Sequence, residues 1–148
     1  MFLLGLLLLT GNANGEYNRA RTWGMKPKVL ICKSSKTKVS TVKSAIDFWK
    51  KEGFDIGSIY KEKNNECKDG YEYGYIIIKG QDNIDTSKVH GLTTPWFKKG
   101  TKTQVSATIK LNQNLANELD LVKHELGHGL GLGHTSKFDH VMSEYANY

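Results

Sequence analysis

The sequence predicts one domain of the α+β (α/β-like) class, with a sheet of about five strands and two helices. Its 148 residues are the size of one ordinary domain, and a hydrophobic content of 39% is enough for a packed core. Short apolar or β-branched runs separated by polar loops indicate strands. Two longer stretches instead repeat apolar residues every three or four positions, which indicates helices.

The first expected elements are a strand, a helix and a second strand. Residues 28–33 ("KVLICK") form a brief apolar run behind a proline, as in a buried strand. Apolar residues then recur at positions i, i+3, i+4 and i+7 of a helix: Val42, Ala45, Ile46 and Trp49. Ser40 can cap this helix and Gly53 can end it. With a strand at residues 54–60 ("FDIGSIY"), the unit should form a right-handed parallel crossover.

Three further strands are expected before the last helix. Residues 71–79 ("YEYGYIIIK") are rich in aromatic and β-branched side chains, which favour a strand. Residues 92–97 ("LTTPWF") predict a short edge strand, because Pro95 is tolerated only at an edge. Apolar and polar residues alternate over 105–111, which predicts a half-buried strand. Residues 16–26 are polar and aperiodic, so we expect a lead-in without regular structure.

The N-terminus differs in kind from the rest of the chain. Residues 1–15 ("MFLLGLLLLTGNANG") begin with an apolar run and then become small and polar, which is typical of a signal peptide. The alternatives are an N-terminal membrane anchor and a buried segment, but the run is short for a bilayer. We therefore expect an exported protein, extracellular or periplasmic, with no stable membrane span after processing. Residues 16–148 would be its folded domain.

In an exported protein, the even number of cysteines, Cys32 and Cys67, favours one disulfide; the alternative is two unpaired thiols. The net charge of +6 fits either a preference for acidic partners or simply a basic, soluble surface. The lysines are scattered and do not interleave with aromatic residues, so nucleic acid is not an expected partner.

The last predicted helix carries three of the five histidines, within residues 122–134 ("VKHELGHGLGLGH"). Asn117 is a good N-cap for this helix. His124 and His128 are four residues apart, so they project from one face, and two imidazoles placed in this way can chelate one metal ion. Glu125 borders the same face.

His134 is the candidate third ligand. A straight helix would carry it about 9 Å beyond His128 along the axis, too far to share an ion. The chain must therefore turn between the two residues, and Gly131 can adopt the left-handed conformation that ends a helix. Three protein ligands and an open position are what a catalytic zinc site requires, whereas a structural site has four ligands.

The segment His-Glu-x-x-His-x-x-Gly-x-x-His at 124–134 resembles the motif of the metzincin clan of zinc metallopeptidases, in particular the matrixin-like branch. Met142, in "VMSE", follows His134 by eight residues and is well placed to be the methionine after which the clan is named. The resemblance implies a single metzincin-type domain with a twisted mixed sheet, one backing helix and one active-site helix. Only six residues follow Met142, so we expect the family's C-terminal subdomain to be nearly absent.

The resemblance also implies an activity, that of a zinc-dependent endopeptidase. His124, His128 and His134 would hold one catalytic Zn²⁺, and Glu125 would be the general base for a zinc-activated water. Met142 would lie in a turn beneath the zinc, a role that overlaps with ordinary core packing. A protein or peptide substrate would lie extended along the edge strand at 92–97, bound to a monomer.

Other interpretations remain open at this level. The domain could bind zinc without catalysis and serve a structural or binding role, although the presence of Glu125 argues against this. A basic surface-binding module without zinc is disfavoured by the motif. Asp82 and Asp85 could bind Ca²⁺, as in matrixins, or belong to a solvated polar loop. His90 and His140 are expected to be surface or loop residues.

Overall fold

A computed structural model of the protein describes residues 17–81 and 89–145. The expected signal peptide at 1–15 lies outside these ranges, as do Asp82 and Asp85 of the expected calcium loop. None of the helices within these ranges has the length and apolar character needed to cross a membrane. The elements are β1 (Thr22–Trp23), β2 (Lys28–Ile31), α1 (Val39–Lys51), β3 (Ile59–Lys61), β4 (Tyr75–Gln81), β5 (Gly91–Phe97), β6 (Thr103–Asn112) and α2 (Leu119–Gly129).

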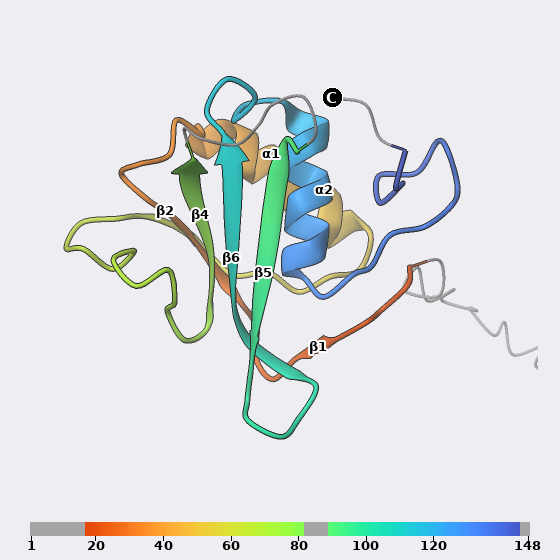
Figure 1. Cartoon of the computed structure of the whole chain (residues 1–148), viewed down its shortest axis with the longest axis horizontal. Coiled ribbons are helices and arrows are strands. Elements are labelled where there is room, and N and C mark those ends of the chain that lie inside the picture. Colours follow the sequence, from red (N-terminus) through yellow and green to blue (C-terminus); the bar gives the residue numbers. More distant parts are fainter. Residues whose placement is uncertain (1–16, 82–88, 146–148) are drawn as a thin grey trace, which may run out of the picture.

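The six strands form one mixed sheet, so the predicted α+β class is confirmed (Figure 1). Its order is β1-β6-β4-β2-β3, with every pair along this path parallel, and β5 pairs with β6 in the antiparallel sense. The first strand–helix–strand unit joins β2 and β3 in parallel, as the sequence predicts. β5 has no second strand partner among the described residues, so it is an edge, as expected for the segment containing Pro95.

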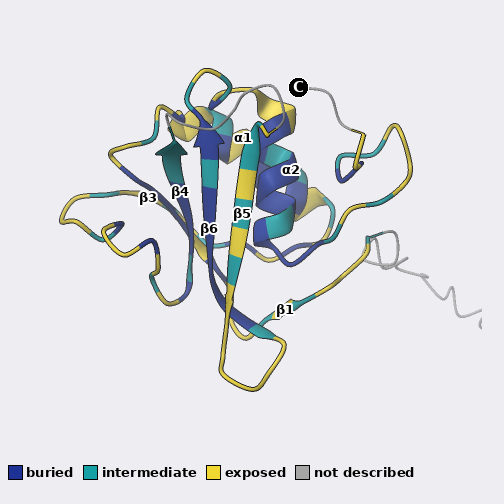
Figure 2. Ribbon diagram, in the orientation of Figure 1, coloured by how far each residue is buried: buried dark blue, intermediate teal, exposed yellow. Residues whose placement is uncertain are grey.

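Both helices pack on the same face of the sheet around one apolar core. The side chains of β4 alternate between the two faces: Ile76 and Ile78 join the helical core, whereas Ile77 joins a small cluster on the opposite face. The four apolar residues predicted for the first helix, Val42, Ala45, Ile46 and Trp49, are all buried there. Figure 2 shows the inner strand β6 as largely buried, while β5 carries exposed and intermediate residues along its length.

The small cluster on the other face contains a disulfide between Cys32 and Cys67. The two residues are 35 apart in sequence, and their S–S distance is 2.07 Å. In the chain-entropy account, a loop of this length stabilises the fold by about 3–4 kcal/mol. The bond ties the end of β2 to the loop before β4, on the side of the sheet that the helices leave uncovered.

Both predicted helix N-caps are wrong. Lys38, not Ser40, is the N-cap of α1, and Glu118, not Asn117, is that of α2. The side-chain oxygen of Asn117 instead accepts hydrogen bonds from the Lys38 N–H at 2.7 Å and from Thr41 Oγ1 at 3.2 Å. Asn117 therefore supports the start of the other helix, a long-range contact that local sequence does not reveal.

Three strand boundaries also differ from prediction. Within the strand expected at 54–60, only the end is extended and paired; Phe54 and Ile56 are buried in the core without joining the sheet. The strand expected at 71–79 begins at Tyr75. The lead-in expected over 16–26 contains β1, which pairs in parallel with β6. Two residues are too few to show any periodicity, so sequence patterning misses such a strand.

Candidate functional site

The histidine-bearing helix α2 lies beside the edge strand β5 (Figure 1). Between them is a cavity of about 380 Å³. It is lined from one side by the motif residues His124, Glu125, His128 and His134. β5 contributes the other side. The structure therefore brings the three predicted ligands and the predicted base to one cavity at the sheet edge.

The three histidines converge on one point through the same ring nitrogen. The Nε2 atoms of His124 and His128 are 3.1 Å apart, and His134 Nε2 lies 3.2 Å from the former and 3.0 Å from the latter. A tetrahedral ion with bonds of about 2.0–2.1 Å holds its ligands about 3.3–3.4 Å apart. The spacing of the three nitrogens thus fits Zn²⁺ with a small adjustment.

The turn after α2 is what brings His134 back. α2 ends at Gly129, and Gly131 follows with φ of 97°, a conformation that favours glycine. The Leu132 N–H donates to Gly127 O at 3.0 Å and the Gly131 N–H donates to His128 O at 3.0 Å, which is the Schellman pattern. The chain reverses at the glycine that the sequence singles out.

Backbone carbonyls fix the protonation of two of the imidazoles. His124 Nδ1 donates to Val141 O and His128 Nδ1 donates to Leu132 O, both at 2.8 Å. Because a carbonyl can only accept, each ring carries its hydrogen on Nδ1 and presents a lone pair on Nε2. Burial lowers the pKa of His124 and lowers that of His128 to about 4, which favours the neutral form of both rings. Neutral rings with lone pairs facing one point are a donor set for a cation.

Glu125 lies on the same cavity, held by the edge strand. Thr93 lies in the middle of β5. Its hydroxyl Oγ1 donates a 2.6 Å hydrogen bond to Glu125 Oε2. Burial raises the pKa of Glu125 to about 7, and the hydrogen bond from Thr93 opposes that rise. A Cβ atom on Gly91 would lie 2.7 Å from the Oε1 and Cγ atoms of Glu125, so a larger residue at this point of β5 would displace the carboxylate.

Comparison with known proteins fits this geometry. The sequence model of a family described as "Metallo-peptidase family M12B Reprolysin-like" matches residues 32–135. The match covers well over half of the chain and includes the whole histidine motif. The chain belongs to that family. It is a family of metallopeptidases, so the predicted metzincin-type assignment is confirmed at this level, and the family implies zinc. A search among curated proteins finds none that matches the chain.

In this reprolysin-like chain, Met142 is buried beneath α2. A Cβ atom on Gly127, between the two helical histidines, would lie 2.3 Å from Met142 Sδ and 2.7 Å from Trp49 Cζ2. Met142 lies in a turn over residues 140–143, the methionine turn, in which the Ser143 N–H donates to His140 O at 2.8 Å. The Thr135 N–H also donates to Met142 O at 2.9 Å. Met142 thus packs against the stretch of α2 that carries the ligands.

Sequence reasoning missed several residues of the site. His140, expected only as a surface or loop residue, accepts the Met142 N–H at its Nδ1 at 3.0 Å. His90, expected in the same way, lines the cavity, as does Arg21. Thr93 lies within the predicted edge strand but carries no motif that would single it out. Arg21, His90 and Thr93 were missed because the cavity is formed by segments that are distant in the chain. His140 was missed because its contact with Met142 depends on how that turn is folded.

We predict that Gly127→Ala lowers the free energy of unfolding by about 1–3 kcal/mol, because the new methyl group overlaps Met142 and Trp49. Helix propensity alone would predict a gain of about 1 kcal/mol. Gly129→Ala is the matched control, since its nearest contact would be Ile76 Cγ2 at 3.2 Å. Denaturant unfolding measures both; an unfolding free energy for Gly127→Ala above wild type would contradict the packing.

Proposed function

We propose that this chain is a zinc-dependent endopeptidase in which His124, His128 and His134 hold the metal and Glu125 is the general base. The observation that carries the proposal is the convergence of three Nε2 atoms within 3.2 Å, on a cavity that also contains a buried carboxylate. Family membership supports the reaction class. The motif and Met142 support metzincin-type chemistry, and the likeness to the matrixin-like branch stays a prediction.

The chain's own groups can supply general acid–base catalysis. When bound, zinc supplies a Lewis acid that polarises a peptide carbonyl and acidifies water. Glu125 accepts a proton from the attacking water and later delivers it to the leaving amine. Because Thr93 holds Oε2, the other carboxylate oxygen, Oε1, is the one available for proton transfer. Nearby positive charge lowers the pKa of a carboxyl, which favours the ionised base in the loaded enzyme.

The substrate is proposed to be a protein or peptide, bound in extended form along β5. No strand of the described residues pairs with the side of β5 that does not face β6, which leaves backbone N–H and C=O groups there for a peptide to pair with. An added peptide strand would place its scissile bond beside Glu125, because Thr93 and Gly91 of β5 touch that carboxylate. The edge predicted at 92–97 is thus the proposed substrate strand, as part of β5.

We also propose that residues 16–148 form a monomeric catalytic domain and that the protein is exported. The apolar segment at the N-terminus and the disulfide between Cys32 and Cys67 support export, since disulfides persist in oxidising compartments. Family membership is compatible with an extracellular site of action.

The metal assignment predicts about one zinc ion per chain in the purified protein and its loss in His128→Ala. Removing one of three imidazoles leaves two ligands, too few to retain the ion against dialysis. His90→Ala is the matched control, because His90 lines the cavity but is not one of the three converging histidines. Zinc is counted by mass spectrometry of the metal; stoichiometric zinc in folded His128→Ala would refute the assignment.

The role of Glu125 predicts that Glu125→Gln binds zinc normally but loses peptide hydrolysis by about a hundredfold or more. The amide keeps the shape of the side chain and cannot accept the proton. Digestion of a degenerate peptide library, with and without a chelator, measures the loss. Equal cleavage by both forms would remove Glu125 from the mechanism. A zinc-loaded wild type that cleaves nothing would favour the non-catalytic, zinc-binding alternative.

Thr93 is a positioning residue, because it acts through Glu125. Thr93→Val keeps the branched shape that suits a strand but removes the hydroxyl, so kcat should fall about tenfold. The hydrogen bond lowers the pKa of Glu125, so its loss should move the acid limb of the pH–rate profile to higher pH. Thr93→Ser keeps a hydroxyl donor, so kcat and the pH of the acid limb should both stay close to their wild-type values. An unmoved acid limb in Thr93→Val would reduce Thr93 to a packing role.

A further inference from the structure

The segment that leads into β1 is fixed against the turn between His128 and His134. The N–H groups of Ala20 and Arg21 both donate to Gly131 O, at 3.0 and 3.1 Å, and the Gly133 N–H donates to Asn18 O at 2.8 Å. A Cβ atom on Gly131 would lie 2.6 Å from Arg21 O, so the two backbones touch. Arg21 is therefore held at a fixed place beside the ligand-bearing turn.

The side chain of Arg21 lines the same cavity as the three histidines and Glu125. Its guanidinium carbon lies 5.8 Å from the centre of the Phe97 ring, at the far end of β5. Within the described ranges, Arg21 forms no ion pair, and its Nε atom is buried without a hydrogen-bond partner. Arg21 thus brings to the lining of the proposed substrate cavity a cation that forms no ion pair within the described chain.

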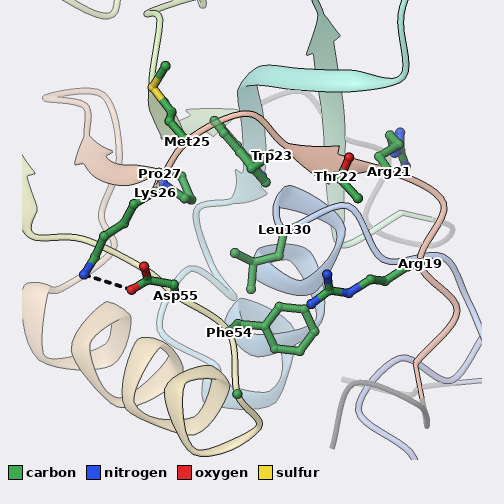
Figure 3. Close-up of a pocket in the computed structure, with 11 residues that line it drawn as sticks. Arg19, Arg21, Thr22, Trp23, Met25, Lys26, Pro27, Phe54, Asp55 and Leu130 are labelled. Carbon is green, nitrogen blue, oxygen red and sulfur yellow. Dashed lines mark ion pairs between the residues drawn. The ribbon is translucent and has the colours of Figure 1, made fainter. Parts of the chain in front are cut away.

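The neighbouring Lys26 differs from Arg21, because its charge is paired with a carboxylate. A second cavity, of about 320 Å³, lies on the other side of the segment and shares Arg21 with the first (Figure 3). There Lys26 pairs with Asp55 at 2.8 Å, and the Arg19 guanidinium lies 4.9 Å from the centre of the Phe54 ring. Figure 3 shows the Arg21 side chain away from the ion pair of Lys26 and Asp55, and Arg21 also lines the substrate cavity.

We propose that Arg21 is a specificity-determining residue that binds an aspartate or glutamate side chain of the substrate. Guanidinium offers several N–H donors in a planar fork that matches a carboxylate, which makes it the side chain best suited to this recognition. Glu125 is the only carboxylate among the described residues that line the cavity, and Thr93 already holds it. The inference rests on the proposed peptidase function and names the class of its substrate.

The geometry also places the acidic residue along the peptide. Thr93 touches Glu125, and Phe97, beside Arg21, lies four residues further along β5, about 13 Å at the usual strand rise. A peptide paired with β5 therefore brings one of its side chains to Arg21 within about four residues of the scissile bond. The acidic residue lies on the side of that bond that faces the Phe97 end of β5.

A digest of a degenerate peptide library locates the preferred position, and a matched peptide pair, glutamate against glutamine at that position, measures the preference. Wild type should cleave the glutamate peptide with about tenfold higher kcat/KM, an advantage that shrinks as salt is raised. In Arg21→Gln the kcat/KM values of the two peptides should be equal. Arg21→Glu should reverse the charge preference, so that a peptide with lysine at this position is cleaved best. As a control, Arg19→Gln, a substitution of the neighbouring arginine, should keep the wild-type preference for the glutamate peptide. A ratio unchanged in Arg21→Gln overturns the proposal.

Binding separates this inference from the peptidase proposal. In the zinc-loaded Glu125→Gln background, the labelled glutamate peptide should bind about tenfold tighter than its glutamine partner by fluorescence anisotropy, and adding Arg21→Gln should remove the difference. Equal binding of the two peptides overturns the acidic subsite whether or not wild type cleaves them. If wild type cleaves no peptide but binds the acidic one through Arg21, the subsite stands and the endopeptidase proposal falls.

Discussion

The meeting of three imidazole lone pairs is the constraint on which the rest of this structure depends. Neutral Nε2 atoms 3.0–3.2 Å apart repel one another unless a cation lies between them. Holding them there requires carbonyls that fix the ring tautomers, a helix that spaces two of the rings by one turn, and a reversal that returns the third. The Schellman turn at Gly131 and the methionine turn at Met142 supply the carbonyls as well as the geometry.

The edge strand joins the metal site to the sheet. β5 is antiparallel to β6, and no other strand in the described part of the chain pairs with its outer side, a feature that exposes a protein to unwanted strand pairing. Here the same strand touches the carboxylate of Glu125 through Thr93 and passes it closely at Gly91. In the proposed function, the edge that would bind an extended peptide and the carboxylate that would act on it therefore form one structural unit.

The N-terminal segment completes the cavity from a third direction. Its two-residue strand β1 pairs with β6. The indole Nε1 of Trp23 donates to Gly129 O, at the end of α2, at 2.9 Å. Gln104 Nε2, from β6, donates to the same carbonyl at 2.7 Å. The end of the histidine helix is therefore capped by side chains rather than left to solvent, and Arg21 reaches the cavity as a consequence of the same docking.

The sequence by itself determined the α+β class, the helix with its two spaced histidines, the turn at Gly131 and the edge position of the strand containing Pro95. These follow from periodicity and from the backbone limits of glycine and proline, which act over a few residues. Only the tertiary structure decided that Asn117 supports α1, that Thr93 holds Glu125, that His140 holds the methionine turn and that Arg21 enters the cavity. Each of these contacts joins segments distant in the chain or depends on how a turn is packed, and no local pattern encodes which side chains the packing brings together.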